Sequence, residues 1–363
     1  MGTKRRTKKV IGVILLVIVS AVLIVGGITI YGRSQMSKIP ALTFEEALEY
    51  TTKNNPDAVI TVGIVKDGQI SYKVYGENGQ EIPARPYTYE IGSLTKTFTA
   101  ALINKAVLAG KMNGNDTIDR YLTLPGGNEY PTIRELLTHT SGYKAYYFES
   151  PMIMNRLKGR NDFYGVTKEM VLEKAGDLNM DEEGCDFVYS NYGYAVLGLV
   201  LEAVYGTDYT SLLNDFTRNE LGLTDTKISD GSGELGNYWE WKDGDAYLPA
   251  GAVTSNIFDM LLYAQMQLED HPYLSGCHDS LQVIDASTEA YSMMGIHMDE
   301  IGMSWVIDKE NGVVWHNGGT GDYNSYLGFH PETGTAVVVL ANTAPGYRIP
   351  ATVLGIKRLL ELV

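Results

Sequence analysis

Short runs in which apolar positions dominate or alternate predict β-strands at both ends of the chain. Near the N-terminal end, residues 59–65 and 70–75 flank Asp67-Gly68, a pair typical of a β-hairpin turn. Toward the C-terminal end, strand-like runs cover residues 303–307, 312–316, 325–330 and 335–341. Residues 331–334 form a turn between the last two runs. We expect these strands to pair in one antiparallel sheet assembled from the two chain ends.

Helical spacing of apolar residues fills most of the chain between these strands. A capping box of Thr43 and Glu46 predicts a first helix that stops near Asn54-Asn55-Pro56. Further helical segments cover residues 94–108, 133–137, 194–204 and 257–268, and residues 351–363 form a closing helix. The order of elements therefore predicts an α+β fold with a helical lobe inserted into the sheet, and a cleft between the two.

The most apolar segment of the chain precedes all of these elements. Residues 10–32 carry no charge, and a helix of that length spans a hydrocarbon core of about 30 Å. Basic residues before it predict a cytoplasmic N-terminus. We expect a cytoplasmic tail (1–9), a transmembrane anchor (10–32), a tether (33–42) and one extracytoplasmic domain (43–363) in the cell membrane. The alternative is a cleaved signal peptide, but its apolar region is usually about 7–15 residues long and ends in a small-residue cleavage site.

Composition and charge exclude several classes of function. Of the 363 residues 44% are hydrophobic and 20% charged, as in a globular protein with a large core. The formal net charge is −15, and five basic residues lie within the first nine positions, so the remainder is more acidic still. Such a body repels nucleic acid. Cys185 and Cys277 do not have the spacing of metal ligands, and we expect no metal or cofactor. The two cysteines form either one disulfide or two separate thiols.

The candidate nucleophile is Ser93, which follows Gly92 at the start of a helical run and precedes Lys96 by three positions. The first turn of a helix exposes unpaired N–H groups and a partial positive charge, both favourable to a developing oxyanion. Lys96 lies one turn further on the same face, where it can stabilise an alkoxide or accept the hydroxyl proton. Ser141 and Lys144 repeat the spacing in a loop-like stretch. Alone, the spacing is more often a helix cap with a solvated lysine.

Two further segments supply matching chemistry. Tyr189-Ser190-Asn191 offers a phenol that can act as a general base and an amide that both donates and accepts hydrogen bonds. The alternative for Tyr189 is a core tyrosine beside a turn. Residues 316–321 read His-Asn-Gly-Gly-Thr-Gly after an apolar strand, and glycines there let a substrate approach backbone N–H groups. The alternative is a glycine-rich hairpin turn with His316 partly exposed.

The order of these motifs resembles that of the serine β-lactamase-related family. The matching segments are Tyr89–Lys96, Tyr189–Tyr194 and residues 316–321, supported by Leu136–Gly142 and Tyr326–Gly334. The family includes class C β-lactamases, DD-carboxypeptidases, D-aminopeptidases and some esterases, and is related to penicillin-binding proteins. The resemblance implies an α/β sandwich with an antiparallel sheet and an all-helical lobe.

The resemblance also implies a role for each motif residue. Ser93 is similar to the acylated nucleophile, Lys96 to its activator, and Tyr189 to the general base that passes the serine proton to the leaving group. The backbone N–H groups of Ser93 and Gly319 would form the oxyanion hole. The implied substrate-binding residues are Asn191, His316, Gly318, Gly319 and Thr320. His316 stands where many β-lactamases have lysine; a histidine there is only partly charged near neutral pH and is more common in the peptidases and esterases.

These observations predict a membrane-anchored extracytoplasmic serine hydrolase that acts through a Ser93 acyl-enzyme on a peptide-like amide. A D-amino-acid or cell-wall-like substrate fits the DD-carboxypeptidases and D-aminopeptidases of the family. The alternatives are an esterase or β-lactamase of the same family, and a penicillin-binding sensor that does not turn over. The sequence leaves the oligomeric state open. His139, at a helix-to-loop junction, is predicted to satisfy nearby backbone groups.

Overall fold

The computed structural model describes residues 37–179 and 185–363. The expected cytoplasmic tail and membrane anchor, and the first part of the tether, lie outside the described residues. Among the helices that are described, none combines the length and the apolar character needed to cross a bilayer.

A nine-stranded antiparallel sheet is the centre of the structure, with the order β3-β2-β1-β12-β11-β10-β9-β8-β7. Its strands from the N-terminal end are β1 (Ile60–Lys66), β2 (Gln69–Tyr75) and β3 (Glu81–Ile82). Its strands from the C-terminal end are β7 (Gln282–Val283), β8 (Glu300–Ile301), β9 (Val306–Asp308), β10 (Val313–Gly319), β11 (Asn324–His330) and β12 (Thr335–Ala341). The two groups meet where β1 pairs with β12, with Val62 opposite Val339. The prediction of one antiparallel sheet from both chain ends is therefore confirmed.

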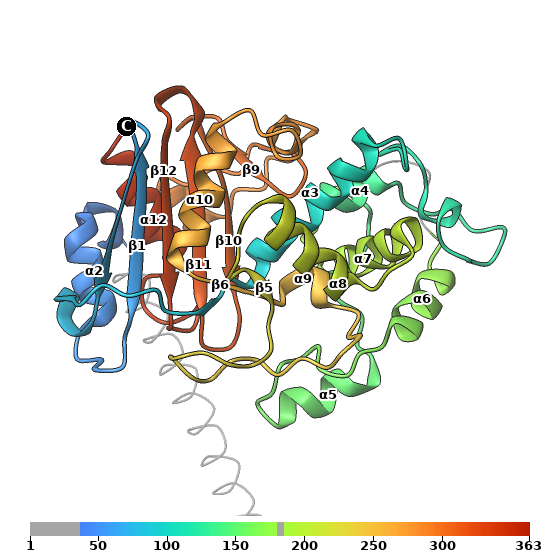
Figure 1. Cartoon of the computed structure of the whole chain (residues 1–363), viewed down its shortest axis with the longest axis horizontal. Helices are drawn as coiled ribbons and strands as arrows, with labels where there is room; N and C mark the ends of the chain where they lie inside the picture. The colour runs from blue at the N-terminus through green and yellow to red at the C-terminus, as the bar shows by residue number, and fades with distance from the viewer. Residues whose placement is uncertain (1–36, 180–184) are drawn as a thin grey trace, which may run out of the picture.

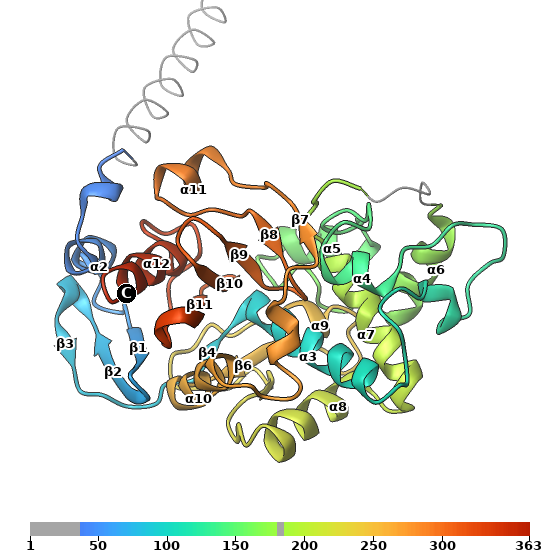
Figure 2. The same ribbon diagram turned by 90° about the horizontal axis from the view of Figure 1, so that it is seen from above.

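Helices cover both faces of this sheet (Figures 1 and 2). Helices α2 (Phe44–Thr52) and α12 (Ala351–Leu360) pack on one face, and α10 (Ile257–Leu268) packs on the other. The predicted capping box begins α2, since the Thr43 hydroxyl accepts a hydrogen bond from the Glu46 N–H at 3.2 Å and the Glu46 carboxylate accepts one from the Thr43 N–H at 2.9 Å. The short α11 (Glu289–Met293) lies on the same side of the sheet as α12 (Figure 2).

The remaining helices form a lobe beside the sheet (Figure 1). They are α3 (Thr95–Leu108), α4 (Ile133–Leu137), α5 (Ser150–Leu157), α6 (Lys168–Asp177), α7 (Asn191–Tyr205), α8 (Tyr209–Asp215) and α9 (Leu248–Gly251). A small sheet of order β4-β6-β5 joins the two parts through β4 (Tyr89–Glu90), β6 (Val253–Ser255) and β5 (Lys227–Ile228). Single-turn helices are η1 (Ile39–Ala41), η2 (Glu77–Gly79), η3 (Gly92–Leu94), η4 (Ile118–Arg120), η5 (Phe216–Glu220), η6 (Ser275–His278) and η7 (Pro331–Thr333).

One continuous apolar core connects this lobe to the sheet. Phe98 and Leu102 of α3, Val196 of α7, Leu261 of α10 and Leu327 of β11 are all fully buried members of it. Burial of apolar surface on this scale is the main stabilising contribution to a fold of this size. Helix α3 is buried along most of its length, so the segment that begins at η3 is held rigidly between lobe and sheet.

Candidate active site

Ser93 lies at the point where the small sheet passes into the buried helix of the lobe. It is the central residue of η3, which follows β4 and continues directly into α3. Lys96, in the first turn of α3, is fully buried, and its Nζ lies 3.0 Å from the Ser93 Oγ. The structure therefore brings the predicted nucleophile and its predicted activator into hydrogen-bond contact.

The Lys96 amine has two further partners. Its Nζ donates to the Asn191 Oδ1 at 2.8 Å and to the Ala250 carbonyl oxygen at 2.5 Å. Burial lowers the pKa of Lys96 well below the ordinary lysine value. A neutral amine has two N–H groups, and both partners are acceptors, so the lone pair of neutral Lys96 faces the Ser93 hydroxyl. This arrangement suits a base that removes the Ser93 proton.

Tyr189 stands on the other side of Ser93. Burial of its hydroxyl raises the pKa of Tyr189, and a hydrogen bond with Ser93 opposes that shift. The centre of its ring lies 5.0 Å from the Lys96 Nζ. A phenol with a raised pKa stays protonated at neutral pH, so Tyr189 can donate a proton in this site and the lysine is the better acceptor.

His139 packs against Tyr189. Its Nδ1 accepts a hydrogen bond from the Ser190 N–H at 3.0 Å, which confirms the prediction that it satisfies nearby backbone. Its ring also packs 4.5 Å from the Tyr189 ring, centre to centre, and lines the cleft, a role that no local pattern around His139 indicated. Burial lowers the pKa of His139 well below the ordinary histidine value, so the ring is neutral.

The glycines of the His-Asn-Gly-Gly motif are needed because β10 passes very close to η3. A Cβ on Gly318 would lie 1.9 Å from the Ile91 carbonyl oxygen, and one on Gly92 would lie 2.4 Å from the Gly319 nitrogen. Gly92 also has φ = +51°, a conformation that L side chains rarely adopt. The Ser325 hydroxyl donates to the Ile91 carbonyl oxygen at 2.7 Å and holds the contact. Backbone groups at Ser93 and Gly319 are therefore neighbours.

His316 lies within strand β10, paired opposite Leu327, and is only 3% exposed. The alternative of a partly exposed residue in a hairpin turn is wrong, because pairing with β11 continues to Gly319. The His316 Nδ1 lies 2.6 Å from the Asn317 carbonyl oxygen, which can only accept, so Nδ1 carries the hydrogen. Burial lowers the pKa of His316 to about 3, so the ring is neutral rather than partly charged near pH 7.

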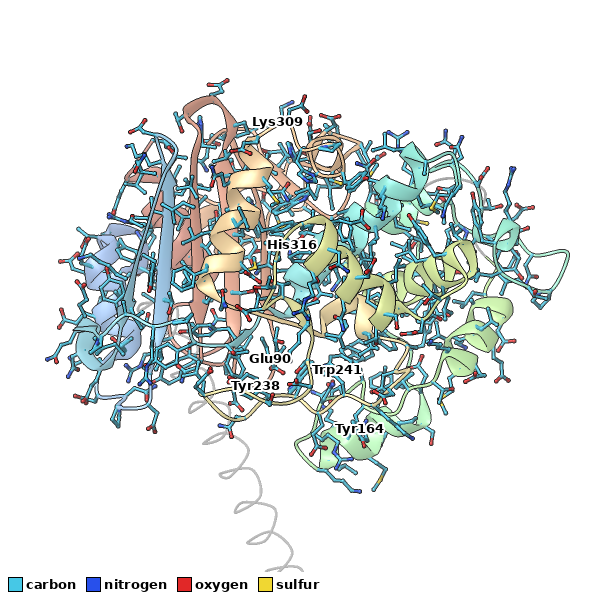
Figure 3. The ribbon with its side chains drawn as sticks, in the orientation of Figure 1. Glu90, Tyr164, Tyr238, Trp241, Lys309 and His316 are labelled. Carbon is cyan, nitrogen blue, oxygen red and sulfur yellow. The ribbon has the colours of Figure 1, made fainter. Side chains whose placement is uncertain are left out.

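A cavity of about 400 Å³ opens between the sheet and the lobe at these residues. Its lining includes five of the predicted site residues, namely Ser93, Tyr189, His316, Gly318 and Gly319. Figure 3 shows His316 at the centre of the molecule, at the junction of the two parts. Lys96 and Asn191 do not line this cavity. They are hydrogen-bonded to each other, and Lys96 connects them to Ser93.

Thr320 and Glu90 form a second buried contact near the site. The Thr320 hydroxyl donates to the Glu90 Oε2 at 2.5 Å, and the Trp239 N–H donates to the Glu90 Oε1 at 2.6 Å. Burial raises the pKa of Glu90 to about 7, against the effect of these two hydrogen bonds. In Figure 3 Glu90 lies below His316, near Tyr238. Sequence reasoning missed Glu90, because its partners are more than a hundred residues away in the chain.

The second serine–lysine pair is not a comparable site. The Ser141 Oγ accepts a hydrogen bond from the Tyr143 N–H, and the Lys144 side chain is exposed beside Tyr147. Cys277 is buried and its thiol donates to the Tyr273 carbonyl oxygen, so no disulfide joins it to Cys185. Within residues 37–179 and 185–363, no three His, Cys, Asp or Glu side chains are grouped so that they could hold a metal ion.

Comparison with known proteins agrees with this geometry. The model of the family described as Beta-lactamase matches residues 53–355. The chain belongs to the β-lactamase family. That family and its structural relatives are serine hydrolases that include penicillin-binding-protein homologues, so the resemblance predicted from the three motifs is confirmed.

Curated relatives of this β-lactamase-family chain are distant. Protein flp of Staphylococcus aureus (strain MW2) is 26% identical over 312 residues, with 78% of this chain covered. The chain spans 59% of the length of that relative. A β-lactamase of Pseudomonas fluorescens is 22% identical over 331 residues, covering 78% of this chain and 88% of its own.

Solved structures show the same fold. A β-lactamase/D-alanine carboxypeptidase from Yersinia pestis superposes with a TM-score of 0.69 at 20% identity, covering 90% of this chain and 98% of its own. The octameric penicillin-binding protein homologue from Pyrococcus abyssi gives a TM-score of 0.66 at 23% identity, covering 84% and 73%. The predicted sheet-and-helix fold of this family is therefore confirmed.

Proposed function

We propose that this β-lactamase-family chain is a serine hydrolase that forms an acyl-enzyme at Ser93 and acts on peptide-like amides, including D-amino-acid or cell-wall-like peptides. The observation that carries the proposal is the buried Lys96, whose Nζ lies 3.0 Å from the Ser93 Oγ. Its two hydrogens are directed to Asn191 and Ala250, which leaves the lone pair for the Ser93 proton. An activated serine of this kind performs acyl transfer.

The reaction begins when neutral Lys96 removes the Ser93 proton and Oγ attacks the substrate carbonyl carbon. The N–H groups of Ser93 and Gly319 stabilise the oxyanion. The Tyr189 hydroxyl then gives its proton to the departing amine or alcohol and receives one from protonated Lys96. A water molecule hydrolyses the acyl-enzyme by the same steps in reverse. Asn191 holds the amide on the acyl side of the substrate.

Small esters are the second candidate substrate. The cleft beside Ser93 has apolar walls that include Met298, Val306 and Trp315, and such a site also accepts an ester. A DD-carboxypeptidase and an esterase of the family differ in their leaving groups. The carboxypeptidase releases an amino acid that carries a carboxylate, and the esterase releases a neutral alcohol.

We also propose that residues 10–32 anchor the protein in the membrane with the hydrolase domain on the outer face. The length and uncharged character of this segment, preceded by basic residues, support the proposal. Carbonate washing of membranes from expressing cells should leave the full chain in the pellet, and external protease should degrade the domain in intact spheroplasts. Release by carbonate would contradict it.

The acyl-enzyme is tested by measuring the intact mass of the full chain after exposure to a fluorophosphonate probe. We expect one adduct on the parent protein and none on Ser93→Ala, because only an activated serine reacts. Ser141→Ala is the matched control, since its serine belongs to the other serine–lysine pair, and it should label fully. No adduct on the folded parent, or an adduct on Ser93→Ala, would contradict the proposal.

A further inference from the structure

The proposed role of Tyr189 assigns the cavity beside Ser93 to the leaving group. Tyr189, which protonates the departing atom, is part of its lining, and so is His316. Asn191, on the acyl side, is not part of the lining and lies behind Lys96. On this assignment the leaving group occupies the cavity when its bond to the acyl group breaks.

The described residues that line this cavity include no lysine and no arginine. Its walls are mostly apolar and aromatic, and their larger side chains include Phe187, Tyr291, Met298, Ile301 and Trp315. Lys309, the lysine labelled in Figure 3, lies at the surface away from His316 and pairs with Glu300 at 2.8 Å. A carboxylate in the cavity would have no fixed positive charge beside it.

The two histidines of the cavity do not replace that charge. His316 is neutral and donates from Nδ1 to its own neighbour's carbonyl oxygen, so its Nε2 is a hydrogen-bond acceptor. The His139 Nδ1 accepts from the Ser190 N–H, so the neutral ring carries its hydrogen on Nε2, which is a buried, uncharged donor without a hydrogen-bond partner among the described residues. The amide nitrogen of Asn317 donates to the Thr352 hydroxyl at 2.8 Å and is also occupied. An acceptor at His316 repels a carboxylate and suits a leaving group that carries an N–H or O–H.

We infer that this cavity selects an uncharged, partly apolar leaving group, so that the enzyme cleaves esters or internal or capped amides rather than releasing a C-terminal amino acid. This inference rests on the proposed acyl-enzyme at Ser93. In the step concerned, the Ser93 Oγ–acyl bond forms, the bond from the acyl carbon to the leaving oxygen or nitrogen breaks, and Tyr189 supplies the proton. Water, the second substrate, then releases the acid.

The test compares two aryl esters of N-acetyl-D-alanine that differ only in charge, the ester of 3-hydroxybenzamide and the ester of 3-hydroxybenzoate. Both release a phenol of similar shape, followed by absorbance with the full chain. We expect kcat/KM for the carboxamide to exceed that for the carboxylate by about 30-fold or more, because a buried carboxylate would lose its hydration without gaining a positive charge beside it. Equal rates, or a preference for the carboxylate, would overturn the inference while turnover itself upheld the proposed function.

A charge placed in the wall should change the preference. Met298→Arg puts a cation on the cavity wall, and we expect the ratio of kcat/KM for the carboxamide to that for the carboxylate to fall at least about 10-fold. Met298→Gln has a similar length without charge and should leave the ratio within 3-fold of the parent. If the two variants shift the ratio equally, the selection does not depend on charge and the inference fails. If neither ester is hydrolysed and Ser93 does not label, the inference and the proposed function fail together.

Discussion

At the scale of single residues, the chemistry depends on where the three hydrogen-bond partners of one amine lie. Lys96 would be an ordinary cation if its Nζ faced water. Here two acceptors, Asn191 Oδ1 and the Ala250 carbonyl oxygen, fix the direction of its hydrogens, and the Ser93 Oγ lies 3.0 Å away on the remaining side. Burial lowers the pKa of Lys96, which makes the neutral amine available at a pH where a surface lysine is charged.

The first prediction concerns this proton acceptor. Because the active form of Lys96 is neutral, kcat/KM should fall as the pH is lowered through its pKa, and that limb should lie well below the range of ordinary lysines, about 10.4. Lys96→Arg keeps a cation that cannot act as a base, so we expect acylation to slow by at least about 100-fold. Steady-state rates on the carboxamide ester across pH measure both effects.

Lys105→Arg is the control for this prediction. Lys105 lies on the same helix but pairs with Glu220 near the surface, so its replacement by another cation should leave the rate and the pH profile as they are. Full activity of Lys96→Arg, or a rate that is highest at acid pH, would exclude a neutral lysine base.

At the scale of elements, the site depends on the contact between η3 and β10. The two segments are separated by more than two hundred residues, and their backbones approach each other closely. The glycines permit this approach, and the pairing of β10 with β11 holds Gly318 and Gly319 in place. Any atom added at the contact would push the Gly319 N–H away from the substrate.

The second prediction tests this contact with Gly92→Ala. A Cβ at Gly92 would lie 2.4 Å from the Gly319 nitrogen, so we expect labelling of Ser93 by the fluorophosphonate to slow by at least about 100-fold. Gly110→Ala is a matched control, because Gly110 also has positive φ, +67°, but nothing lies within 4 Å of its added Cβ. That variant should lose about 1 kcal/mol of stability and keep its labelling rate. Similar labelling of the two variants would show that the contact does not govern reactivity.

Local patterns predicted the elements well. The expected helices at 133–137 and 257–268 and the expected strand at 335–341 have the bounds of α4, α10 and β12. Helix α7 begins three residues before the predicted start, because the Ser190 hydroxyl accepts the Gly193 N–H and caps the helix at Asn191. The strands of the small sheet could not be predicted, since two or three residues have no measurable period and their pairing is with distant segments.

The partners of the site residues were predicted less completely than the residues themselves. The motifs indicated Ser93, Lys96, Tyr189 and His316, all of which the fold brings together. They could not show that His316 would be buried and neutral, because its charge depends on burial by segments that are distant in the sequence. The hydrogen bond from Thr320 to Glu90 could not be predicted either, because the two residues are far apart in the sequence.

At the scale of the whole molecule, Glu90 connects three distant parts of the chain around the cleft. It belongs to β4, just before the nucleophile, and its carboxylate binds Thr320 after β10 and the backbone of Trp239. The side chain is 2% exposed. A buried carboxylate with two donors is stabilised by them, but the loss of hydration still favours its protonated form.

The third prediction concerns the stability of this connection. Because burial raises the pKa of Glu90 to about 7, above the value of about 4.3 in an unfolded chain, the folded protein holds a proton between these pH values that the unfolded chain has lost. The free energy of unfolding should therefore fall as the pH rises through this interval, by roughly 2–4 kcal/mol between pH 4.5 and 8. Glu90→Gln resembles the protonated form and should lose that part of the dependence, as measured by urea unfolding.

The exposed Glu332→Gln serves as the control, and its pH dependence should match that of the parent protein. If Glu90→Gln also shows the full pH dependence of the parent, Glu90 is not the group that changes protonation on unfolding.

The pairing of β1 with β12 has a consequence for how the protein is made. Strand β1 leaves the ribosome early, but the strand that covers its inner edge is separated from it by about 270 residues. Until β12 has been synthesised, the unpaired edge of β1 can associate with other chains. Pairing strands so far apart in the sequence also makes folding slow. The sheet is therefore completed only after nearly all of the hydrolase domain has been synthesised, so the edge of β1 that pairs with β12 stays uncovered for most of that time.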